Sequence, residues 1–417
     1  RPDELAACYK ELEGQLLTRW DAPLVNDFFA MIFYGVLRKL VSKWCGDTDG
    51  TLQNNLLCGE GGIISAEPAR HVLSLADLAW KHPGFALKLA DSPLDEVLRE
   101  LESFPEFSES YHSYLDKFGD RCLDELKLES ATLHDDPTTL LRSVGNLALR
   151  AREPGAVPRA NPEMQMRGKA EARAADALTA HPARRRVFQW VLAQTRARVR
   201  DRENLRFERT RLFGRVRRIF VAMGRDFHAR NLLASPTDIF YLELGEILGF
   251  CDGTATTTDL KSLANLRQAE FTRYRGMEPP SDRFETRGPV NQGNTFQQVK
   301  ETKADVLPAD GVWRGTGCSP GVVRGPVRIV SDPRNAVVKP GEILVAERTD
   351  PGWIMLFASA AGVLVERGSL LSHSAIVSRE MGIPAIVAIP AITRQLQNGE
   401  WVEMDGGSGI VKRVQHD

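Results

Sequence analysis

Cysteine, histidine and aromatic residues are scarce in this 417-residue sequence, which has six cysteines, eight histidines and 7% Phe, Trp and Tyr. The cysteines are scattered, with no CxxC pair and no spacing typical of metal ligands. In a chain of this length, that pattern excludes a disulfide scaffold and indicates reduced thiols, as in the cytoplasm. We therefore expect a cytoplasmic protein and no metal site within this chain.

The sequence also lacks an excess of charge of either sign and lacks long apolar runs. Its 54 Lys and Arg residues nearly balance its 55 Asp and Glu residues, for a net charge of −1. The net charge therefore does not indicate nucleic acid or a membrane surface as a partner. Polar residues interrupt the apolar stretches before they reach the ~20 residues of a membrane span. No signal peptide is visible.

The sequence does contain a change in its apolar pattern near residue 280, from helical to strand-like. Before it, apolar residues recur at helical spacing, as in 70–91, 94–103, 108–126 and 184–231. After residue 311, short apolar segments between Gly and Pro residues predict strands. We predict a multidomain protein in which a mainly α-helical domain (1–278) is followed by a polar linker (279–310) and a compact α/β domain (311–417).

More specific predictions apply to two segments of the helical region. One segment suggests a buried helix through apolar residues at helical spacing, namely Val25, Phe28, Phe29, Ile32, Leu37 and Leu40. Its apolar face is interpreted as core rather than as a ligand groove and consists of Phe28, Phe29, Met31, Ile32 and Phe33. A large apolar ligand would nevertheless need a surface of this kind. Residues 238–242 (Asp-Ile-Phe-Tyr-Leu) have the character of a short strand.

One histidine stands at the predicted start of a helix, within LLSHSAIVSREMGIPAIV (370–387). Ser372 is a good N-cap residue, Gly382 suits the end of the helix, and Pro384 follows it. His373 then lies in the first turn, where free N–H groups and the helix dipole stabilise an anion. By itself the pattern is also compatible with a partly exposed polar histidine.

The neighbours of His373 suit phosphoryl chemistry. A neutral imidazole nitrogen can attack phosphorus, and the product would lie in a site that favours negative charge. Ser372 and Ser374 add hydroxyl donors, and Gly368 in the preceding turn leaves room for a phosphate to approach.

Residues 366–387 resemble the phosphohistidine motif of the PEP-utilising enzymes, which is roughly Gly-Gly-x-x-Ser-His-x-Ala-Ile-Val-Ala-Arg-Glu-x-Gly-Ile-Pro-Ala-Val. Further matches follow in order at 315–321, 341–345, 349–353 and 405–409. Three positions depart from the usual pattern: Ser369, Ser378 and Ala388 stand where Gly, Ala and Gly are common. The resemblance implies that 311–417 form a swivelling phosphohistidine domain of the β/β/α type, with His373 as the catalytic carrier.

The helical region contains an arginine-rich stretch. Arg198, Arg202, Arg206 and Arg209 recur at spacings of four and three, so they share one helix face. Guanidinium groups on such a face could clamp a phosphoryl group. The same pattern is typical of a solvated helix face that pairs with neighbouring acidic residues.

Residues 1 to about 250 resemble the middle domain of the rifampin phosphotransferase and PEP-synthase-like enzymes, notably at 114–121 and 238–242. An Arg-Glu-x-Pro-Lys segment of that family faces the phosphohistidine, and its counterpart here is 202–206, Arg-Glu-Asn-Leu-Arg. The family's lysine is replaced by an arginine, which stays protonated and cannot shuttle a proton. The resemblance therefore implies that Arg202 and Arg206 bind phosphate.

The resemblance also implies an ATP-dependent phosphotransferase of the dikinase type. His373 would carry a phosphoryl group to a small-molecule acceptor bound by the helical domain. No stretch resembles the ATP-grasp domain that binds ATP and Mg²⁺ in this family, and the chain starts with Arg1. We therefore expect the nucleotide domain to have been removed or to belong to another chain. Two alternatives are an ATP-dependent ligase, as in the prodigiosin-forming condensation enzymes, and a non-catalytic phosphocarrier.

Overall fold

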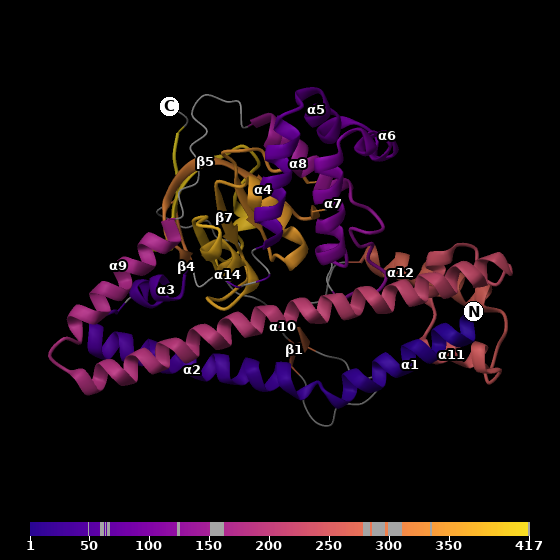
Figure 1. Cartoon of the computed structure of the whole chain (residues 1–417), viewed down its shortest axis with the longest axis horizontal. Coiled ribbons are helices and arrows are strands. Elements are labelled where there is room, and N and C mark those ends of the chain that lie inside the picture. Colours follow the sequence, from indigo (N-terminus) through magenta and orange to yellow (C-terminus); the bar gives the residue numbers. More distant parts are fainter. Residues whose placement is uncertain are drawn as a thin grey trace. The chain divides into compact units, whose positions relative to one another are not determined.

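The structure is a computed structural model that describes residues 1–48, 50–58, 62, 64, 67–122, 126–150, 162–277, 284–285, 297–298, 311–333 and 336–415 (Figure 1). The described α-helices are α1 (Pro2–Thr18), α2 (Asp21–Cys45), α3 (Thr51–Leu57), α4 (Glu67–Trp80), α5 (Pro83–Asp91), α6 (Leu94–Glu100), α7 (Pro105–Phe118), α8 (Thr138–Arg150), α9 (Pro162–Ala177), α10 (Pro182–Ala229), α11 (Leu244–Asp252), α12 (Leu260–Arg275), α13 (Ile354–Ser359), α14 (His373–Glu380) and α15 (Ile392–Gln395). The described strands are β1 (Phe284–Glu285), β2 (Gln297–Gln298), β3 (Val312–Arg314), β4 (Thr316–Ser319), β5 (Val322–Ile329), β6 (Ile343–Ala346), β7 (Gly362–Val365), β8 (Ala385–Val387), β9 (Trp401–Asp405) and β10 (Ile410–Arg413).

The chain divides into two compact units, and the long helix α10 contributes residues to both. The first unit comprises 1–17 and 216–306, and the second comprises 18–215 and 307–417. Within the first unit, α1 packs on the last part of α10, where the Tyr9 and Phe220 ring centroids are 5.2 Å apart. The sheet module and the candidate site described below belong to the second unit.

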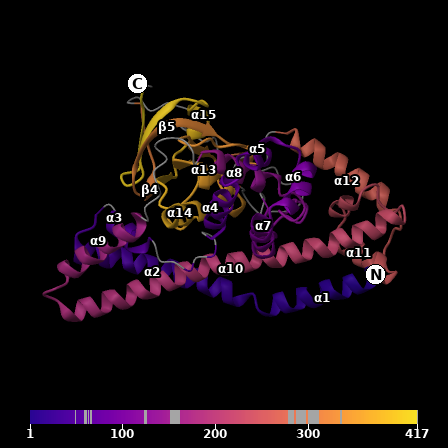
Figure 2. The same cartoon turned by 45° about the horizontal axis from the view of Figure 1, so that its top comes forward.

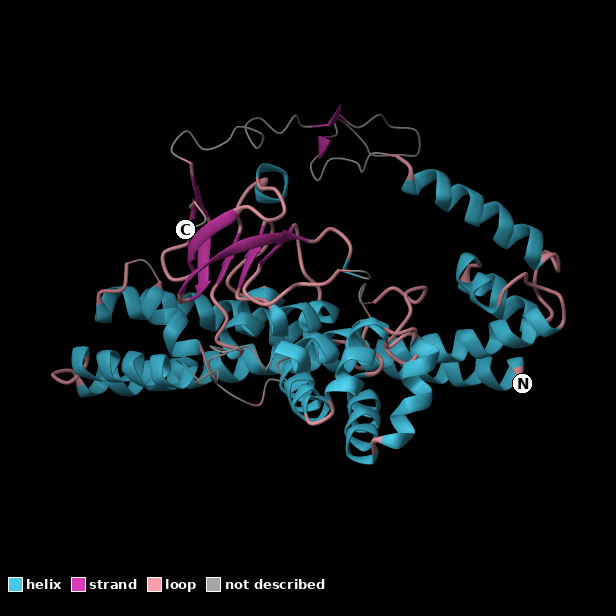
Figure 3. Cartoon of the chain, turned by 90° about the horizontal axis from the view of Figure 1, so that it is seen from above, coloured by secondary structure: helices cyan, strands magenta, loops and turns pink. Residues whose placement is uncertain are grey.

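The C-terminal module of the second unit is built on an eight-stranded sheet with the order β3-β10-β9-β5-β6-β7-β8-β4. The central strands β5, β6, β7 and β8 are parallel, and the outer pairs are antiparallel. Figure 3 shows these strands gathered into one module. Helix α14 connects the parallel neighbours β7 and β8, so the start of α14 lies at the carboxyl end of β7. Ligand sites of parallel sheets usually lie at this edge.

Both faces of the central strands are buried, which explains why β6 and β7 are apolar at nearly every position. Alternate residues face opposite sides: Leu344 and Val363 belong to one hydrophobic core, whereas Ile343 and Leu364 belong to another. The core containing Ile343 is completed by the module's own residues. The core containing Leu344 extends beyond the module.

Helix α13 joins the core that contains Leu344 to the helical bundle formed by α4–α8. Every residue of α13 is buried, and the helix packs against both α4 and α8 (Figure 2). Tyr114 of α7, which is fully buried, directs its hydroxyl group at the sulfur of Met355 at 3.7 Å. The bundle and the sheet module therefore share one continuous hydrophobic core.

Asp47 organises the turn between α2 and α3. Its buried carboxylate accepts hydrogen bonds from the backbone N–H groups of Gly50, Leu52 and Gln53 at 3.1–3.3 Å. We expect Asp47→Ala to lower the free energy of unfolding by about 2–4 kcal/mol, because these buried donors lose a charged acceptor. Urea unfolding measures the change. Asp47→Asn keeps one acceptor oxygen and should lose less, and equal losses in the two variants would contradict this role.

The structure confirms the predicted fold class, a mainly helical region followed by an α/β module. The strands that the apolar segments after residue 311 predict are present as β5, β6, β7, β8, β9 and β10. Most of the predicted linker 279–310 lies outside the described residues, and the domain boundaries stay predictions. None of the described helices is long and apolar enough to cross a membrane.

Two local predictions are wrong. Residues 238–242 do not form a strand, because Pro236–Tyr241 form a 3₁₀ helix that starts with a capping box of Ser235 and Asp238. The first part of the predicted apolar face of α2 is not core, since Phe28 and Met31 are 64% and 67% exposed. Helix α2 is buried through Asn26 and Ala30 on its other side and, further along, through Leu37 and Val41, so the prediction holds for Leu37. Periodicity identified the apolar stripe but not the side that packs.

Candidate active site

Helix α14 starts and ends where the sequence predicts. It begins at His373, after Ser372 in an extended conformation (φ −69°, ψ 155°), and it is followed by Gly382 at φ 62°. The left-handed backbone at residue 382 favours glycine, which explains why the helix ends here. His373 is therefore the first residue of a helix at the carboxyl end of β7, as the sequence predicts.

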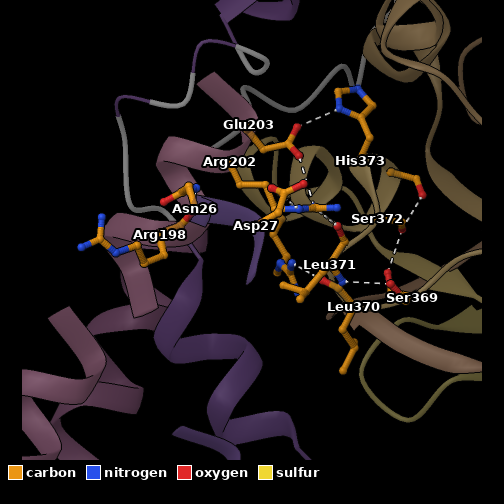
Figure 4. A network of polar contacts seen from close by, with 12 residues as sticks. Asn26, Asp27, Arg198, Arg202, Glu203, Ser369, Leu370, Leu371, Ser372 and His373 are labelled. Atoms are coloured by element: carbon orange, nitrogen blue, oxygen red, sulfur yellow. Dashed lines mark hydrogen bonds and ion pairs between the residues drawn. The ribbon is translucent and has the colours of Figure 1, made fainter. Parts of the chain in front are cut away.

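His373 faces a carboxylate from α10. Its Nδ1 lies 3.1 Å from Oε2 of Glu203, and the two side chains are only 4% and 0% exposed (Figure 4). An ionised carboxylate can only accept a hydrogen bond, so Nδ1 carries the hydrogen and donates it to Glu203, and Nε2 keeps its lone pair in the neutral ring. The ring nitrogen that keeps its lone pair is therefore Nε2.

The environment keeps Glu203 ionised. Burial alone would raise its pKa, but the hydrogen bond with His373 and the positive charges of His373, Arg206 and Arg202 outweigh burial and lower the pKa to about 2. A carboxylate with so low a pKa is a poor general base. It is suited instead to orienting the imidazole and stabilising its protonated form.

Arg202 binds the loop that precedes α14. Its Nη1 donates to the carbonyl oxygen of Leu371 at 2.6 Å, and its Nε lies 3.3 Å from Oδ1 of Asp27 on α2. Nη1 is also 3.7 Å from Oε1 of Glu203. Two of the N–H groups of Arg202 are thus occupied by protein acceptors, and the contact with Leu371 fixes the loop against α10.

Arg206 lies one helical turn beyond Arg202 and is half-buried. Its charge contributes to the low pKa of Glu203, yet its guanidinium donates to no described residue. Of the two arginines that the sequence singles out, Arg206 has more N–H groups available for an anion near His373. Its role in phosphate binding stays a prediction, as does that of Arg202.

The serines of the loop bond with one another. Ser372 Oγ donates to the carbonyl oxygen of Ser369 at 2.7 Å and lies 3.1 Å from Oγ of Ser374. Since each hydroxyl has one proton, Ser374 is the donor in the second contact. Ser372 occupies the N-cap position, as expected, but its side chain does not cap the helix. Phosphate binding by either serine stays a prediction.

Two further contacts shape the loop. A Cβ on Gly368 would lie 3.1 Å from Cβ of Val387 and 3.3 Å from Oγ of Ser372, so a larger residue would crowd the turn. Arg379, at the other end of α14, donates to the carbonyl oxygen of Leu370 at 2.7 Å. Adjacent carbonyl groups of the loop are thus held from two sides, one by Arg379 of the module and one by Arg202 of α10.

Sequence reasoning missed Glu203 and Asp27 as parts of the site. Glu203 stands within the matched segment 202–206, but the sequence pattern indicated only that it pairs with neighbouring arginines. Asp27 follows no recognisable motif. The signal that could have identified Glu203 is an acidic residue within a basic segment that faces a histidine.

The residues that the structure describes contain no group of three His, Cys, Asp or Glu side chains arranged to hold a metal ion. A phosphoryl donor with Mg²⁺ would need such oxygen ligands or its own phosphates.

Comparison with known families matches two parts of the chain. Residues 338–409 match the PEP-utilising enzyme mobile domain, and residues 24–203 match the rifampicin phosphotransferase fourth domain. Two parts of the chain are thus similar to domains of the PEP-utilising and rifampicin phosphotransferase type. The first match contains His373 and the second ends at Glu203, so the two interacting residues of the site come from two separately matched domains.

Individual relatives cover most of the chain. A rifampicin phosphotransferase from Streptomyces sviceus is 27% identical over 383 residues, which are 90% of this chain and 42% of that protein. An uncharacterised protein from Mycobacterium tuberculosis is 31% identical over 353 residues, 85% of this chain and 37% of that protein. Chondramide synthase from Chondromyces crocatus is 28% identical over 371 residues, 83% of this chain and 9% of that protein. The chain thus spans less than half the length of these relatives.

Proposed function

We propose that this chain carries a phosphoryl group on Nε2 of His373 and delivers it to a small-molecule acceptor bound by the helical region. The observation that carries the proposal is the buried contact between His373 Nδ1 and Glu203 Oε2 at 3.1 Å. It fixes the tautomer that leaves Nε2 nucleophilic and places a carboxylate where the imidazolium needs a counter-charge. The printed name of the Streptomyces sviceus relative supports phosphotransfer as the reaction class.

The proposed reaction has two steps. In loading, Nε2 attacks phosphorus and the bond between phosphorus and the donor's leaving oxygen breaks. In delivery, an acceptor hydroxyl oxygen attacks phosphorus and the Nε2–P bond breaks. The hydroxyl proton then passes to Nε2, which gives an imidazolium facing Glu203. Phosphoryl transfer needs little base catalysis and depends on positioning and charge, which suits a site with arginines and a weakly basic carboxylate.

We propose ATP as the phosphoryl donor, bound with Mg²⁺ by a domain outside the described residues. When bound, ATP would supply the electrophilic phosphorus, while the residues of this chain hold Nδ1 protonated and bind the phosphoryl oxygens. Arg206 is the proposed oxygen-binding group, because its guanidinium is half-buried beside Glu203 and donates to no described residue.

The exposed face of α2 is the proposed surface for the apolar part of the acceptor. Asp27 of α2 contacts Arg202 at the site, and Phe28, the next residue, is exposed. The exposed apolar residues of this face are Leu24, Val25, Phe28, Phe29, Met31 and Ile32. A contiguous apolar face of this kind usually marks a binding surface. It lies on the same helix as a residue of the site, so a bound acceptor could direct a hydroxyl group toward His373.

The experiment that tests the proposal uses potassium phosphoramidate, a chemical phosphoryl donor to imidazoles, with the chain itself. We expect a phosphohistidine at residue 373, located by mass spectrometry of peptides, with ³¹P NMR showing phosphorus on Nε2. We also expect this signal to be lost when a hydroxyl-bearing acceptor from a panel of apolar compounds is added. A phosphohistidine at 373 that discharges to no acceptor would count against delivery, and phosphorus on Nδ1 would refute the assigned tautomer.

Arg202 offers a test of the delivery step. Because it ties the loop of His373 to α10, we expect Arg202→Ala to slow delivery about 10-fold or more while loading by phosphoramidate changes little. Single-turnover loss of the ³¹P signal measures delivery. Arg198→Ala on the same helix is the matched control and should leave both steps close to wild type. Equal losses in loading and delivery would argue against this function for Arg202.

A ligase is the second candidate function, and the similarity to chondramide synthase favours it. In this version the phosphoryl group activates a carboxyl group of the acceptor, and a second substrate then displaces phosphate. The two functions differ in their products. A stable phosphate ester that accumulates with the acceptor supports the phosphotransferase, and a coupled product with release of inorganic phosphate supports the ligase.

A further inference from the structure

A cavity of about 370 Å³ lies between three helices of the second unit, which are α3, α9 and the first part of α10. These helices and the inner side of α2 lie together (Figure 1) and share a hydrophobic core of their own, which includes Leu37 of α2 and Leu192 of α10. The volume falls in the range of ~300–1,000 Å³ that is usual for small-molecule sites. The exposed apolar residues of α2 do not line this cavity. It is therefore a second candidate site, separate from the surface proposed for the acceptor.

The floor of the cavity is apolar. Leu56, Leu178 and Phe188 line it and are buried in the core. Where larger side chains would fill the space, the facing helices carry small ones, Ala174 on α9 and Ala193 on α10. A ligand that displaces water from such a floor gains free energy in proportion to the apolar area that it covers. The floor therefore suits the apolar body of a small molecule.

The rim of the cavity carries polar groups from α10. Arg185 and Gln189 both line it, and they lie one helical turn apart on the same face of the helix. Both residues are exposed, and their side chains donate to no described residue. A guanidinium group and an amide N–H at this spacing can donate to the two oxygens of one carboxylate. The rim is also near the start of α10, where the helix dipole favours a negative charge.

One acidic residue, Glu171 of α9, also lines the cavity, and its charge is already paired. Its Oε1 accepts hydrogen bonds from Nε of Arg167 at 3.0 Å and from Nη2 of Arg196 at 2.7 Å. Burial alone would raise the pKa of Glu171, but these two arginines lower it, so the carboxylate stays ionised. The lining then has two positive charges, from Arg185 and Arg196, against one negative charge. A single negative charge fits this balance, whereas Glu171 would repel a dianion such as a phosphate monoester.

The cavity is held open by contacts within the protein. Arg196 lines it and donates from Nε and Nη2 to the carbonyl oxygen of Leu56, at 2.9 and 2.5 Å. Leu56 lies in the last turn of α3, where a carbonyl group has no partner within its own helix. The same guanidinium binds Glu171, so Arg196 ties α3 and α9 to α10 around the cavity. A site whose walls are fixed in advance binds its ligand without a further ordering cost.

We propose that this cavity binds a small molecule with an apolar body and one carboxylate group. The carboxylate binds Arg185 and Gln189 at the rim, and the apolar body packs against Leu178 and Phe188 on the floor. Medium-chain fatty acids and arylalkanoic acids belong to this chemical class. The proposal is independent of the carrier function of His373, because binding at the cavity is measured without any phosphoryl transfer.

Isothermal titration calorimetry of the full chain with sodium decanoate, at concentrations below micelle formation, tests the proposal. We expect one saturable site per chain. Decylammonium has the same alkyl chain and the opposite charge, so we expect it to bind at least about 10-fold more weakly. Absence of saturable decanoate binding would overturn the proposal. Equal affinities for the two probes would overturn it as well, because the rim would then make no selection by charge.

Two variants locate the bound decanoate. Ala193→Trp fills the cavity from an exposed position of its lining, so we expect it to abolish binding, whereas Ala172→Trp, at an exposed position of α9 outside the lining, is the matched control. Arg185→Ala should weaken binding roughly 3- to 10-fold, the range for one exposed charged partner. Arg186→Ala, at the exposed neighbouring arginine outside the lining, should leave the affinity unchanged. Circular dichroism checks that every variant is folded.

The exposed apolar face of α2 is the competing place for decanoate, and Phe28→Ser tests it. Loss of binding in Phe28→Ser together with wild-type binding in Ala193→Trp would place the probe on α2 and overturn the proposal. Wild-type affinity in Arg185→Ala would refute the assigned carboxylate position. This last comparison decides the outcome even if Ala193→Trp does not fold, because Arg185 is exposed and its side chain supports no described contact.

Discussion

Replacement of His373 with asparagine is expected to abolish phosphoryl transfer completely, with no detectable phosphohistidine at this position and no acceptor-dependent discharge. The reason is chemical, because the imidazole Nε2 is the proposed nucleophile and asparagine has no nitrogen with a comparable lone pair. Its amide N–H can still donate to Glu203, so the buried carboxylate keeps a partner. ³¹P NMR and peptide mass spectrometry of the phosphoramidate-treated chain measure the loss.

Asparagine is preferred over alanine as the main variant. His373→Ala would leave the fully buried Glu203 without its hydrogen bond, and a buried unpaired charge destabilises a protein strongly. Loss of activity in the His373→Ala variant alone could then result from displacement of the loop that precedes α14. His112→Asn, at an exposed histidine of α7, is the matched control, and it should leave transfer unchanged. Acceptor-dependent discharge at a normal rate in His373→Asn would exclude His373 as the carrier.

Removal of the Glu203 carboxylate is expected to cause the second-largest loss. We expect Glu203→Ala to slow delivery by about 10²- to 10⁴-fold, the range for a carboxylate that orients a catalytic imidazole and stabilises its charge. Without this acceptor, either ring nitrogen can keep the proton, so the phosphohistidine should become a mixture of Nδ1 and Nε2 isomers. Single-turnover discharge and the ³¹P spectrum report the two effects separately.

Glu203→Gln separates the two roles proposed for the carboxylate, which are to orient the imidazole ring and to supply a counter-charge to the imidazolium. Its amide oxygen can still accept a hydrogen bond from the Nδ1–H group, so we expect ³¹P NMR to show the Nε2 isomer alone. Delivery should stay slow, because the neutral amide offers no counter-charge to the imidazolium. A glutamine variant with wild-type delivery would show that the charge is unimportant, and an alanine variant with pure Nε2 phosphorylation would show that another group sets the tautomer.

The low pKa of Glu203 also predicts how the stability of the site depends on pH. The folded-state pKa of about 2 lies below the ordinary value of 4.5. The carboxylate therefore contributes its full stabilisation above pH 4.5, and the contribution is lost as the pH falls from 4.5 toward 2. The free energy of unfolding of the wild type should approach that of Glu203→Gln across this window. A constant difference between the two proteins would contradict the assigned pKa.

The local features of the fold could be predicted because they depend on residues close in sequence. Ser372, Gly382 and Pro384 determine where α14 begins and ends, and their preferences are properties of the backbone. The buried strands β6 and β7 are recognisable from continuous apolar runs between glycines. The position of His373 at the start of a helix followed from these local rules.

The partners of His373 could not be predicted in the same way. Glu203 is 170 residues away in sequence, and no spacing rule connects a helix start in one module with a side chain on α10. Arg202 was identified correctly as a residue near the histidine, but its bond to a backbone carbonyl depends on how the loop approaches. The exposed side of α2 was misassigned for a related reason: an apolar stripe shows amphipathicity, whereas only tertiary packing determines which face is covered.

The burial of His373 has a consequence for storage of the phosphoryl group. Phosphoramidate bonds are hydrolysed by water, and the ring of His373 is 4% exposed when it lies against Glu203. A phosphorylated histidine held in this position would meet little water, so the bond would be spent on an acceptor rather than lost. If His373 is the proposed carrier, the contact that orients the ring also lengthens the lifetime of the phosphohistidine.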